Sequence, residues 1–208
     1  MGRVVAGLPL RIGDAEVPQD RISAAAWAWA QRRLPAYLLA HSVRAYAWAI
    51  VLGLDEGLAV EPRILWPAAL IHDVGLTRIV RNTRCFEYQG AAVARRFLAG
   101  QGMARSDAQR AARAIELHMA LIVTPADGAE SILLDRATGI DVRGSEFERI
   151  SSARAGVMRE YPRGDFDRHF LAAIGREVDA RPGCQSERLL NRVGLAESMA
   201  RSPWRSAD

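Results

Sequence analysis

The chain has 208 residues, half of them hydrophobic and a quarter charged, with a formal net charge of +4. This length suits one well-buried domain or two small ones, and this composition is ordinary for a soluble globular protein. All 28 basic residues are arginines, and they are dispersed along the chain rather than gathered in blocks. We therefore interpret them as solvated helix faces and expect no nucleic-acid partner.

The cysteines and the apolar runs indicate where the protein works. Cys85 and Cys184 form neither a metal-like spacing nor a disulfide framework, which favours a reducing, cytoplasmic setting. The apolar stretch from Val4 to Leu10 is short and interrupted by Gly7 and Pro9, so it does not resemble a secretory signal. No run approaches the roughly 18 apolar residues of a membrane span. We expect a cytoplasmic protein without a membrane partner.

The first half of the chain predicts an extended leader followed by helices. Residues 1–19 contain several glycines and prolines and are expected to be extended. Asp20 is expected to cap a helix that ends near residue 33. Pro35 begins a second helix, which ends near Gly53. Pro62 and Pro67 flank the start of a third, which carries residues 72 and 73 and ends near residue 75.

The second half also predicts helices, separated by loops at about 77–84 and 124–128. Capping-box patterns at Ser106 and Ser145, and an aspartate at position 165, predict three of the helix starts. The expected helices cover about 91–100, 106–118, 129–142, 145–161 and 165–180, with one weak helix at 186–199. The expected fold is all-α: a single-domain helical bundle with its core at 20–180 and a C-terminal tail at 181–208.

The dipeptide His72–Asp73 is the most informative feature of the chain. It stands in the segment Ala68-Ala69-Leu70-Ile71-His72-Asp73-Val74-Gly75-Leu76, which otherwise has the composition of a buried apolar helix. Burying an imidazole and a carboxylate without partners would cost several kcal/mol, roughly the penalty for unsatisfied polar groups. A bound cation would remove that penalty. Adjacent residues on a helix point about 100° apart, so an ion shared by both must lie at the helix edge.

Three further residues on separate helices have the chemistry to complete such a site: His41, His118 and Asp141. Each of them alone would more often be a satisfied core residue or a helix-end charge. Together with the dipeptide, His41 and Asp141 supply two imidazoles and two carboxylates. This donor set suits Zn²⁺, Fe²⁺ or Mn²⁺ and is too rich in nitrogen for Ca²⁺. Asp135 also stands in an apolar helix and is an alternative to Asp141 as the last ligand. The fourth histidine, His169, lies in a charged stretch and is interpreted as a surface residue.

The order of these residues resembles the HD-domain metal-dependent hydrolase superfamily, and within it the cyanamide-hydratase-like branch. The resemblance covers roughly residues 4–170. It is carried by the segments Val5-Ala6-Gly7, His41-Ser42-Val43-Arg44-Ala45-Tyr46, Leu70-Ile71-His72-Asp73-Val74-Gly75-Leu76-Thr77, Phe86-Glu87-Tyr88-Gln89-Gly90-Ala91, Ala114-Ile115-Glu116-Leu117-His118 and Ala137-Thr138-Gly139-Ile140-Asp141-Val142-Arg143-Gly144.

The resemblance implies a fold of the HD-domain type and a role for each site residue. It implies metal ligation by His41, His72, Asp73 and Asp141, and it favours Asp141 over Asp135 because a glycine-containing stretch follows the family's last aspartate. Besides Asp73, it implies that Glu87 and His118 are catalytic and transfer protons. Arg44 and Thr77 would then bind substrate or support the ligands.

The expected activity is metal-assisted addition of water. The resemblance implies a hydratase or hydrolase in which one divalent transition metal, expected to be Zn²⁺ with Fe²⁺ or Mn²⁺ as alternatives, supplies a bound hydroxide. The hydroxide would attack a small nitrile-like molecule such as cyanamide, which would give urea. Cys85 and Met119 depart from the branch's pattern at positions expected near the substrate, and these departures concern the substrate rather than the metal chemistry.

Two other functions stay open at this point. An HD-type phosphohydrolase acting on a nucleotide or phosphate ester could use the same ion, with Arg78, Arg81 and Arg84 near the phosphate. A binding module that kept the fold and lost turnover would bind the metal without activity. In each case the partner is a small molecule, and a homodimer is left open.

Overall fold

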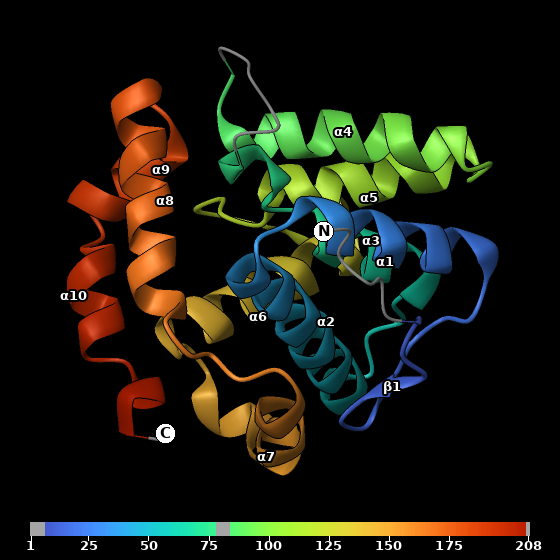
Figure 1. Ribbon diagram of the computed structural model, residues 1–208, viewed down its shortest axis with the longest axis horizontal. Coiled ribbons are helices and arrows are strands. Elements are labelled where there is room, and N and C mark those ends of the chain that lie inside the picture. Colours follow the sequence, from blue (N-terminus) through green and yellow to red (C-terminus); the bar gives the residue numbers. More distant parts are fainter. Residues whose placement is uncertain (1–6, 78–83, 207–208) are drawn as a thin grey trace, which may run out of the picture.

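The computed structural model describes residues 7–77 and 84–206, and these fold almost entirely into helices (Figure 1). The predicted all-α class is confirmed for this part of the chain. Most of the loop expected at 77–84 lies outside the described residues, as does the beginning of the expected leader. The α-helices are α1 (Arg21–Arg33), α2 (Ala36–Glu56), α3 (Pro62–Ile71), α4 (Phe86–Gly100), α5 (Arg105–Leu117), α6 (Ala129–Arg143), α7 (Ser151–Glu160), α8 (Phe166–Ala180), α9 (Gln185–Asn191) and α10 (Leu195–Ala200). The short 3₁₀ helices are η1 (Val74–Leu76), η2 (Pro125–Asp127), η3 (Phe147–Ile150) and η4 (Pro203–Ser206).

The described part of the expected leader is not simply extended. It contains a small antiparallel hairpin of β1 (Arg11–Ile12) and β2 (Ala15–Glu16). Ile12 and Ala15 are buried against the helical core, and the Tyr46 hydroxyl on α2 donates a hydrogen bond to the carbonyl oxygen of Glu16. The hairpin therefore closes one side of α2.

Helix caps agree with the sequence only in part. Asp20 caps α1 as predicted, since its Oδ1 accepts hydrogen bonds from the backbone N–H groups of residues 22 and 23 at 2.8 and 3.0 Å. The patterns at Ser106 and Ser145 do not form capping boxes: α5 begins one residue before Ser106, and η3 follows Ser145. The box forms instead at Thr124, in the segment expected to be a loop. A four-residue pattern is common enough to occur away from true helix starts.

The core is organised around α2, whose middle is buried on all sides by α3, α6 and α8. Its length and apolar composition would allow it to cross a membrane, but 67% of its most hydrophobic 18-residue window is buried inside the molecule. This is the pattern expected of a core helix that is apolar all round. Because α2 is enclosed in this way, polar side chains at its centre need internal partners.

The C-terminal segment differs from the predicted tail. It forms two helices, α9 and α10, where one weak helix was expected. Leu195, Met199 and Trp204 are almost fully buried, and the Trp204 indole donates a hydrogen bond of 2.7 Å to the carbonyl oxygen of Ile140 on α6. The core therefore extends beyond residue 180. Figure 1 shows α8, α9 and α10 along one side of the molecule, next to α6.

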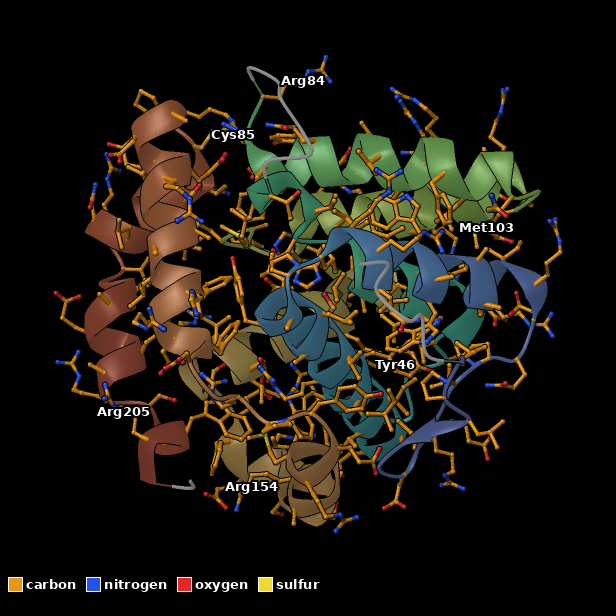
Figure 2. The ribbon with its side chains drawn as sticks, in the orientation of Figure 1. Tyr46, Arg84, Cys85, Met103, Arg154 and Arg205 are labelled. Carbon is orange, nitrogen blue, oxygen red and sulfur yellow. A yellow bond between two sulfur atoms is a disulfide. The ribbon has the colours of Figure 1, made fainter. Side chains whose placement is uncertain are left out.

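The two cysteines are joined, which contradicts the expectation of unpaired thiols. Cys85, at the start of α4, forms a disulfide with Cys184, at the start of α9, across 99 residues of sequence. Figure 2 shows Cys85 where α4 begins, near one end of the α8–α9 pair. No spacing rule could reveal this pair, because only the fold brings the two helix starts together. The cytoplasmic setting stays a prediction, now without the support of free thiols.

Candidate metal centre

The His72–Asp73 dipeptide lies just beyond the end of a helix rather than inside one. The helix α3 ends at Ile71, Asp73 has φ −95° and ψ 9°, and η1 follows at once. Because the backbone leaves the α-helical path here, the two side chains are not held about 100° apart as they would be on a regular helix. Both are buried. The local change of helix type therefore lets adjacent residues face one point.

Two glycines let α4 approach this turn closely. A Cβ at Gly75 would lie 2.2 Å from the carbonyl oxygen of Phe86, at the start of α4. A Cβ at Gly90, within α4, would lie 2.7 Å from the carbonyl oxygen of His72. Neither distance is tolerable for non-bonded atoms, so any side chain at these positions would push the turn and α4 apart. The glycines of the two matched segments thus have a packing role at the site.

Three side chains meet in a compact triangle, which we call the metal triad: His41, His72 and Asp73. The two histidine Nε2 atoms are 3.1 Å apart, and Oδ2 of Asp73 lies 3.5 Å from the first and 3.3 Å from the second. His41 comes from the second turn of α2, whereas His72 and Asp73 come from the turn between α3 and η1. Nearby, Nε2 of His118, at the end of α5, lies 3.6 Å from the other oxygen of Asp73.

The hydrogen bonds of the three histidines orient every Nε2 toward this centre. Nδ1 of His72 lies 2.7 Å from the carbonyl oxygen of Ala69, and Nδ1 of His118 lies 2.6 Å from that of Ile115. A carbonyl oxygen can only accept, so both Nδ1 atoms carry the proton and both Nε2 atoms present a lone pair. Nδ1 of His41 likewise donates to the Asp141 carboxylate at 2.7 Å. Metal-binding histidines are held in this way.

This arrangement is unfavourable unless a cation joins it. Two lone pairs face each other across 3.1 Å, and Oδ2 of Asp73 and Nε2 of His118 are buried atoms without a hydrogen-bond partner. Among the described residues, only histidines approach the Asp73 carboxylate, so no arginine neutralises its charge. A buried, unpaired charge is strongly destabilising. The unpaired atoms are therefore those of a group that could hold a positive ion.

The dimensions of the metal triad fit a transition metal. Donors that lie about 2.0–2.1 Å from one ion are separated from each other by about 3.0–3.4 Å. The three separations of 3.1, 3.3 and 3.5 Å match that spacing closely. Two imidazoles and one carboxylate suit Zn²⁺, Fe²⁺ or Mn²⁺. The donor chemistry and the spacing thus support a buried metal-binding group, and they leave the metal's identity open.

The electrostatics keep the ligands in the forms that bind metal. Burial lowers the pKa of His41 and outweighs the opposing effect of Asp141, so this imidazole is neutral. Burial alone would raise the pKa of Asp73, but His72 and His118 outweigh burial and hold it below its ordinary value. Burial likewise would lower the pKa of His118, and the Asp73 carboxylate raises it instead. The metal triad thus combines a neutral imidazole at His41 with an ionised carboxylate at Asp73.

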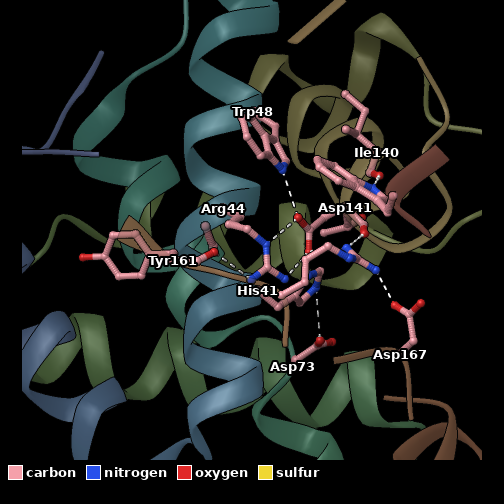
Figure 3. A network of polar contacts seen from close by, with 12 residues as sticks. His41, Arg44, Trp48, Asp73, Ile140, Asp141, Tyr161 and Asp167 are labelled. Atoms are coloured by element: carbon pink, nitrogen blue, oxygen red, sulfur yellow. Dashed lines mark hydrogen bonds and ion pairs between the residues drawn. The ribbon is translucent and has the colours of Figure 1, made fainter. Parts of the chain in front are cut away.

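Asp141 is placed behind His41, and this does not fit the predicted role of direct ligand. Its carboxylate contacts Nδ1 of His41, the ring nitrogen that faces away from the metal triad. Arg44 donates to both of its oxygens at 2.8 Å, and the Trp48 indole donates to Oδ1 at 2.9 Å (Figure 3). Burial would raise the pKa of Asp141, but Arg44 and His41 keep it well below its ordinary value. The structure therefore makes Asp141 the residue that orients His41.

Arg44 has the position that one of its two predicted roles requires. It is completely buried, and its guanidinium binds the Asp141 carboxylate with two parallel hydrogen bonds. Its remaining nitrogen donates to the carbonyl oxygens of Tyr161 and Pro162 at 3.2 Å. These bonds direct the guanidinium away from the metal triad. Arg44 thus supports the site from behind instead of facing a substrate.

The alternative aspartate, Asp135, faces the open side of the site. It lines a cavity of about 280 Å³ together with the metal triad and His118. Asp135 and Asp141 are six residues apart on α6, so their side chains point in directions about 120° apart. Burial raises the pKa of Asp135 to about 6, which is suitable for an acid or base near neutral pH. Sequence reasoning considered this residue only as a ligand.

Glu87 and Thr77 are placed differently from each other. Glu87 is buried in the first turn of α4 with both carboxylate oxygens unpaired, and burial raises its pKa. It is close enough to His118 for each charge to affect the pKa of the other.

The Thr77 hydroxyl donates to the carbonyl oxygen of Val74 at 2.6 Å and helps to end η1. Thr77 is not among the described residues that line the cavity.

The sequence reasoning missed the residues that wall the cavity. Phe170 and Ile174 on α8, Leu189 on α9 and Leu195 on α10 line it opposite α6. Their only signal in the sequence is ordinary amphipathic spacing, which identifies a buried helix face and not what that face covers. His169 is exposed and stacks on Tyr37, as a surface residue does.

Comparison with known proteins adds no identification. No model of a known protein family matches the chain, and no curated protein matches it. The buried polar residues of the site are therefore the basis on which a function is proposed.

Proposed function

We propose that this protein is a metal-dependent enzyme that adds water to a small molecule, as a hydratase or hydrolase of the HD-domain type. The observation that supports this most strongly is the convergence of His41, His72 and Asp73 on one buried point, with both imidazole Nδ1 atoms held by acceptors. A divalent ion bound there would lower the pKa of a coordinated water toward 7 and so supply a nucleophile. Nitrile hydration, such as conversion of cyanamide to urea, is the reaction we propose.

The residues around the metal triad supply the remaining functions. Asp135 faces the cavity and, with its pKa raised to about 6, can hold or release a proton near neutral pH. His118 presents an unpaired Nε2 beside Asp73, and it is close enough to the buried acid Glu87 for each charge to affect the pKa of the other. Addition of water to a nitrile requires a proton for the nitrogen, and this group of acids supplies it.

The cavity gives less support to the phosphohydrolase alternative. Arg143 is the only arginine among the described residues that line it, whereas two acids, Asp73 and Asp135, do so. A phosphate-rich substrate would be expected to meet more positive charge. Arg78 and Arg81, which motivated this alternative, lie outside the described residues.

Metal content in matched histidine variants tests the proposal. His72→Ala removes one donor of the metal triad, while His169→Ala changes an exposed histidine and serves as the control. We expect elemental analysis to find about one transition metal ion per chain in the wild type and in the control, and little in His72→Ala. Cyanamide-to-urea conversion should follow the metal content. Equal metal content in all three proteins would contradict the proposed site, and full metal content without hydration of any nitrile would contradict the reaction.

A further inference from the structure

The cavity that reaches the metal triad has two chemically different ends. Its inner end carries the imidazoles and carboxylates already described. Its other walls are mainly apolar, with Thr138 and Arg143 as the remaining polar side chains, and the apolar residues come from five separate stretches of chain, so the apolar character is not an accident of one helix. The apolar lining residues are Met119, Ala120, Leu121, Val142, Phe170, Ile174, Leu189, Val193 and Leu195.

The apolar wall continues to the protein surface. Leu121 is 61% exposed and Val193 is 42% exposed, although both line the cavity. Ile122, next to Leu121, is 77% exposed. Single exposed apolar side chains are ordinary, but here they border the opening of a cavity that is itself apolar. The entrance therefore favours a ligand with apolar surface.

The cavity is too large for cyanamide alone. A dry cavity of about 150 Å³ accepts benzene, and this one measures about 280 Å³. By that scale it holds a body of roughly ten to twelve non-hydrogen atoms. A molecule as small as cyanamide would leave the apolar walls facing water. The size of the cavity and its apolar lining together indicate a substrate that has an apolar body in addition to its reactive end.

We propose that the substrate of this site has a polar reactive end that reaches the metal triad and an apolar body of roughly ten non-hydrogen atoms that packs against α8, α9 and α10. This inference rests on the proposed function, because that function fixes which end of the substrate lies at the metal triad. Within nitrile hydration, the substrate class is aliphatic or aryl-alkyl nitriles. Together with α8, the helices α9 and α10, which lie in the segment predicted from sequence to be a C-terminal tail, thereby determine specificity.

A series of straight-chain hydroxamic acids tests the apolar body separately from turnover. The hydroxamate group binds divalent metals, and the chain length can be varied from two to about fourteen carbons. With zinc-loaded full-length protein and calorimetry, we expect affinity to rise about fourfold per added methylene. The rise should stop at about eight to ten carbons, when the cavity is full. A matching series of nitriles should show the same trend in kcat/KM.

Two exposed leucines provide a matched pair of variants. Leu121→Asp places a charge at the cavity entrance, whereas Leu54→Asp places one on a 79% exposed leucine of α2 that does not line the cavity. We expect Leu121→Asp to reduce the ratio of long-chain to short-chain affinity by at least about tenfold, and Leu54→Asp to leave that ratio unchanged. Val193→Asp gives a second entrance variant in case the first fails to fold.

The outcomes separate this inference from the proposed function. A flat affinity across the hydroxamates in wild-type protein would overturn the inference, and hydration of cyanamide would then leave the proposed function standing. Rising affinity that the Leu121→Asp variant loses would support the inference, even if no nitrile is turned over and the reaction must be replaced. Equal effects of the two aspartate variants would overturn it.

Discussion

The role of Asp141 gives the sharpest test of the geometry at the metal centre. The resemblance to HD-domain proteins implies that Asp141 binds the metal, whereas the structure places it on the far side of His41 with Arg44. Asp141→Asn keeps the shape of the side chain and removes its charge. Because Asn can still accept from Nδ1 of His41, the variant weakens the orientation of that ring without removing a metal donor.

The expected magnitudes follow from the two kinds of contact. Loss of a residue that orients a ligand lowers metal affinity by about 10- to 100-fold, or about 1.4–2.7 kcal/mol. Loss of a direct donor, as in His72→Ala, should lower it further. Asp141→Asn also leaves the guanidinium of Arg44, which is completely buried, without its carboxylate partner. Breaking a buried ion pair in this way costs about 3–5 kcal/mol in free energy of unfolding.

Two measurements separate these effects. Metal affinity comes from competition with a chelator, and the free energy of unfolding comes from urea denaturation of metal-free protein. The double variant Arg44→Met/Asp141→Asn replaces both charges, so we expect its destabilisation to be about 2 kcal/mol smaller than the sum for the single variants. Its metal affinity should resemble that of Asp141→Asn alone.

One result would refute this reasoning. If folded Asp141→Asn protein lost metal as completely as His72→Ala, then Asp141 would be a donor itself, and the placement of its carboxylate behind His41 would not describe the metal-bound protein.

Two further predictions concern the framework that holds the site. Cys184→Ser opens a disulfide that spans 99 residues. The chain-entropy model gives about 4.7 kcal/mol as an upper value for such a loop, so we expect urea denaturation to show a free energy of unfolding lower by about 2–4 kcal/mol. Equal stability of the wild type with and without reductant would contradict the pairing. Gly90→Ala places a Cβ 2.7 Å from the carbonyl oxygen of His72 and should lower both thermal stability and metal affinity. In the matched change Gly100→Ala, in the same helix, the new Cβ meets no atom within 4 Å, so this variant should instead be stabilised by up to about 1 kcal/mol. Similar effects of the two alanines would show that the close approach of α4 to His72 is unimportant.

The sequence predicted the chemistry of the site better than its geometry. His41, His72, Asp73 and His118 could be selected because ionisable residues in apolar segments demand a partner. Both Asp135 and Asp141 lie in similarly apolar sequence, so the sequence does not separate them. Choosing between them requires knowing how α6 is rotated about its own axis relative to α2. The family pattern favours Asp141, but it does not distinguish a carboxylate that contacts Nδ1 from one that would contact the ion.

The parts that could not be predicted depend on contacts between distant segments. Helix positions in the first 180 residues follow local periodicity and were largely predictable, although the capping-box patterns at Ser106 and Ser145 were misleading. The disulfide depends on two helix starts that meet only in the folded chain. The burial of Trp204 likewise depends on Trp48 and α6, so a polar, weakly periodic segment gave no sign of belonging to the core.

The disulfide divides the chain into parts with different tasks. The segment between Cys85 and Cys184 is a covalently closed ring that contains α4 to α8, whereas all three residues of the metal triad precede it. His118, Asp135 and Asp141, which surround the metal triad, lie inside the ring. The covalent constraint therefore acts on the surroundings of the metal triad and, by tying the start of α9 to the start of α4, on the cavity wall that α9 contributes, and not on the three ligands themselves.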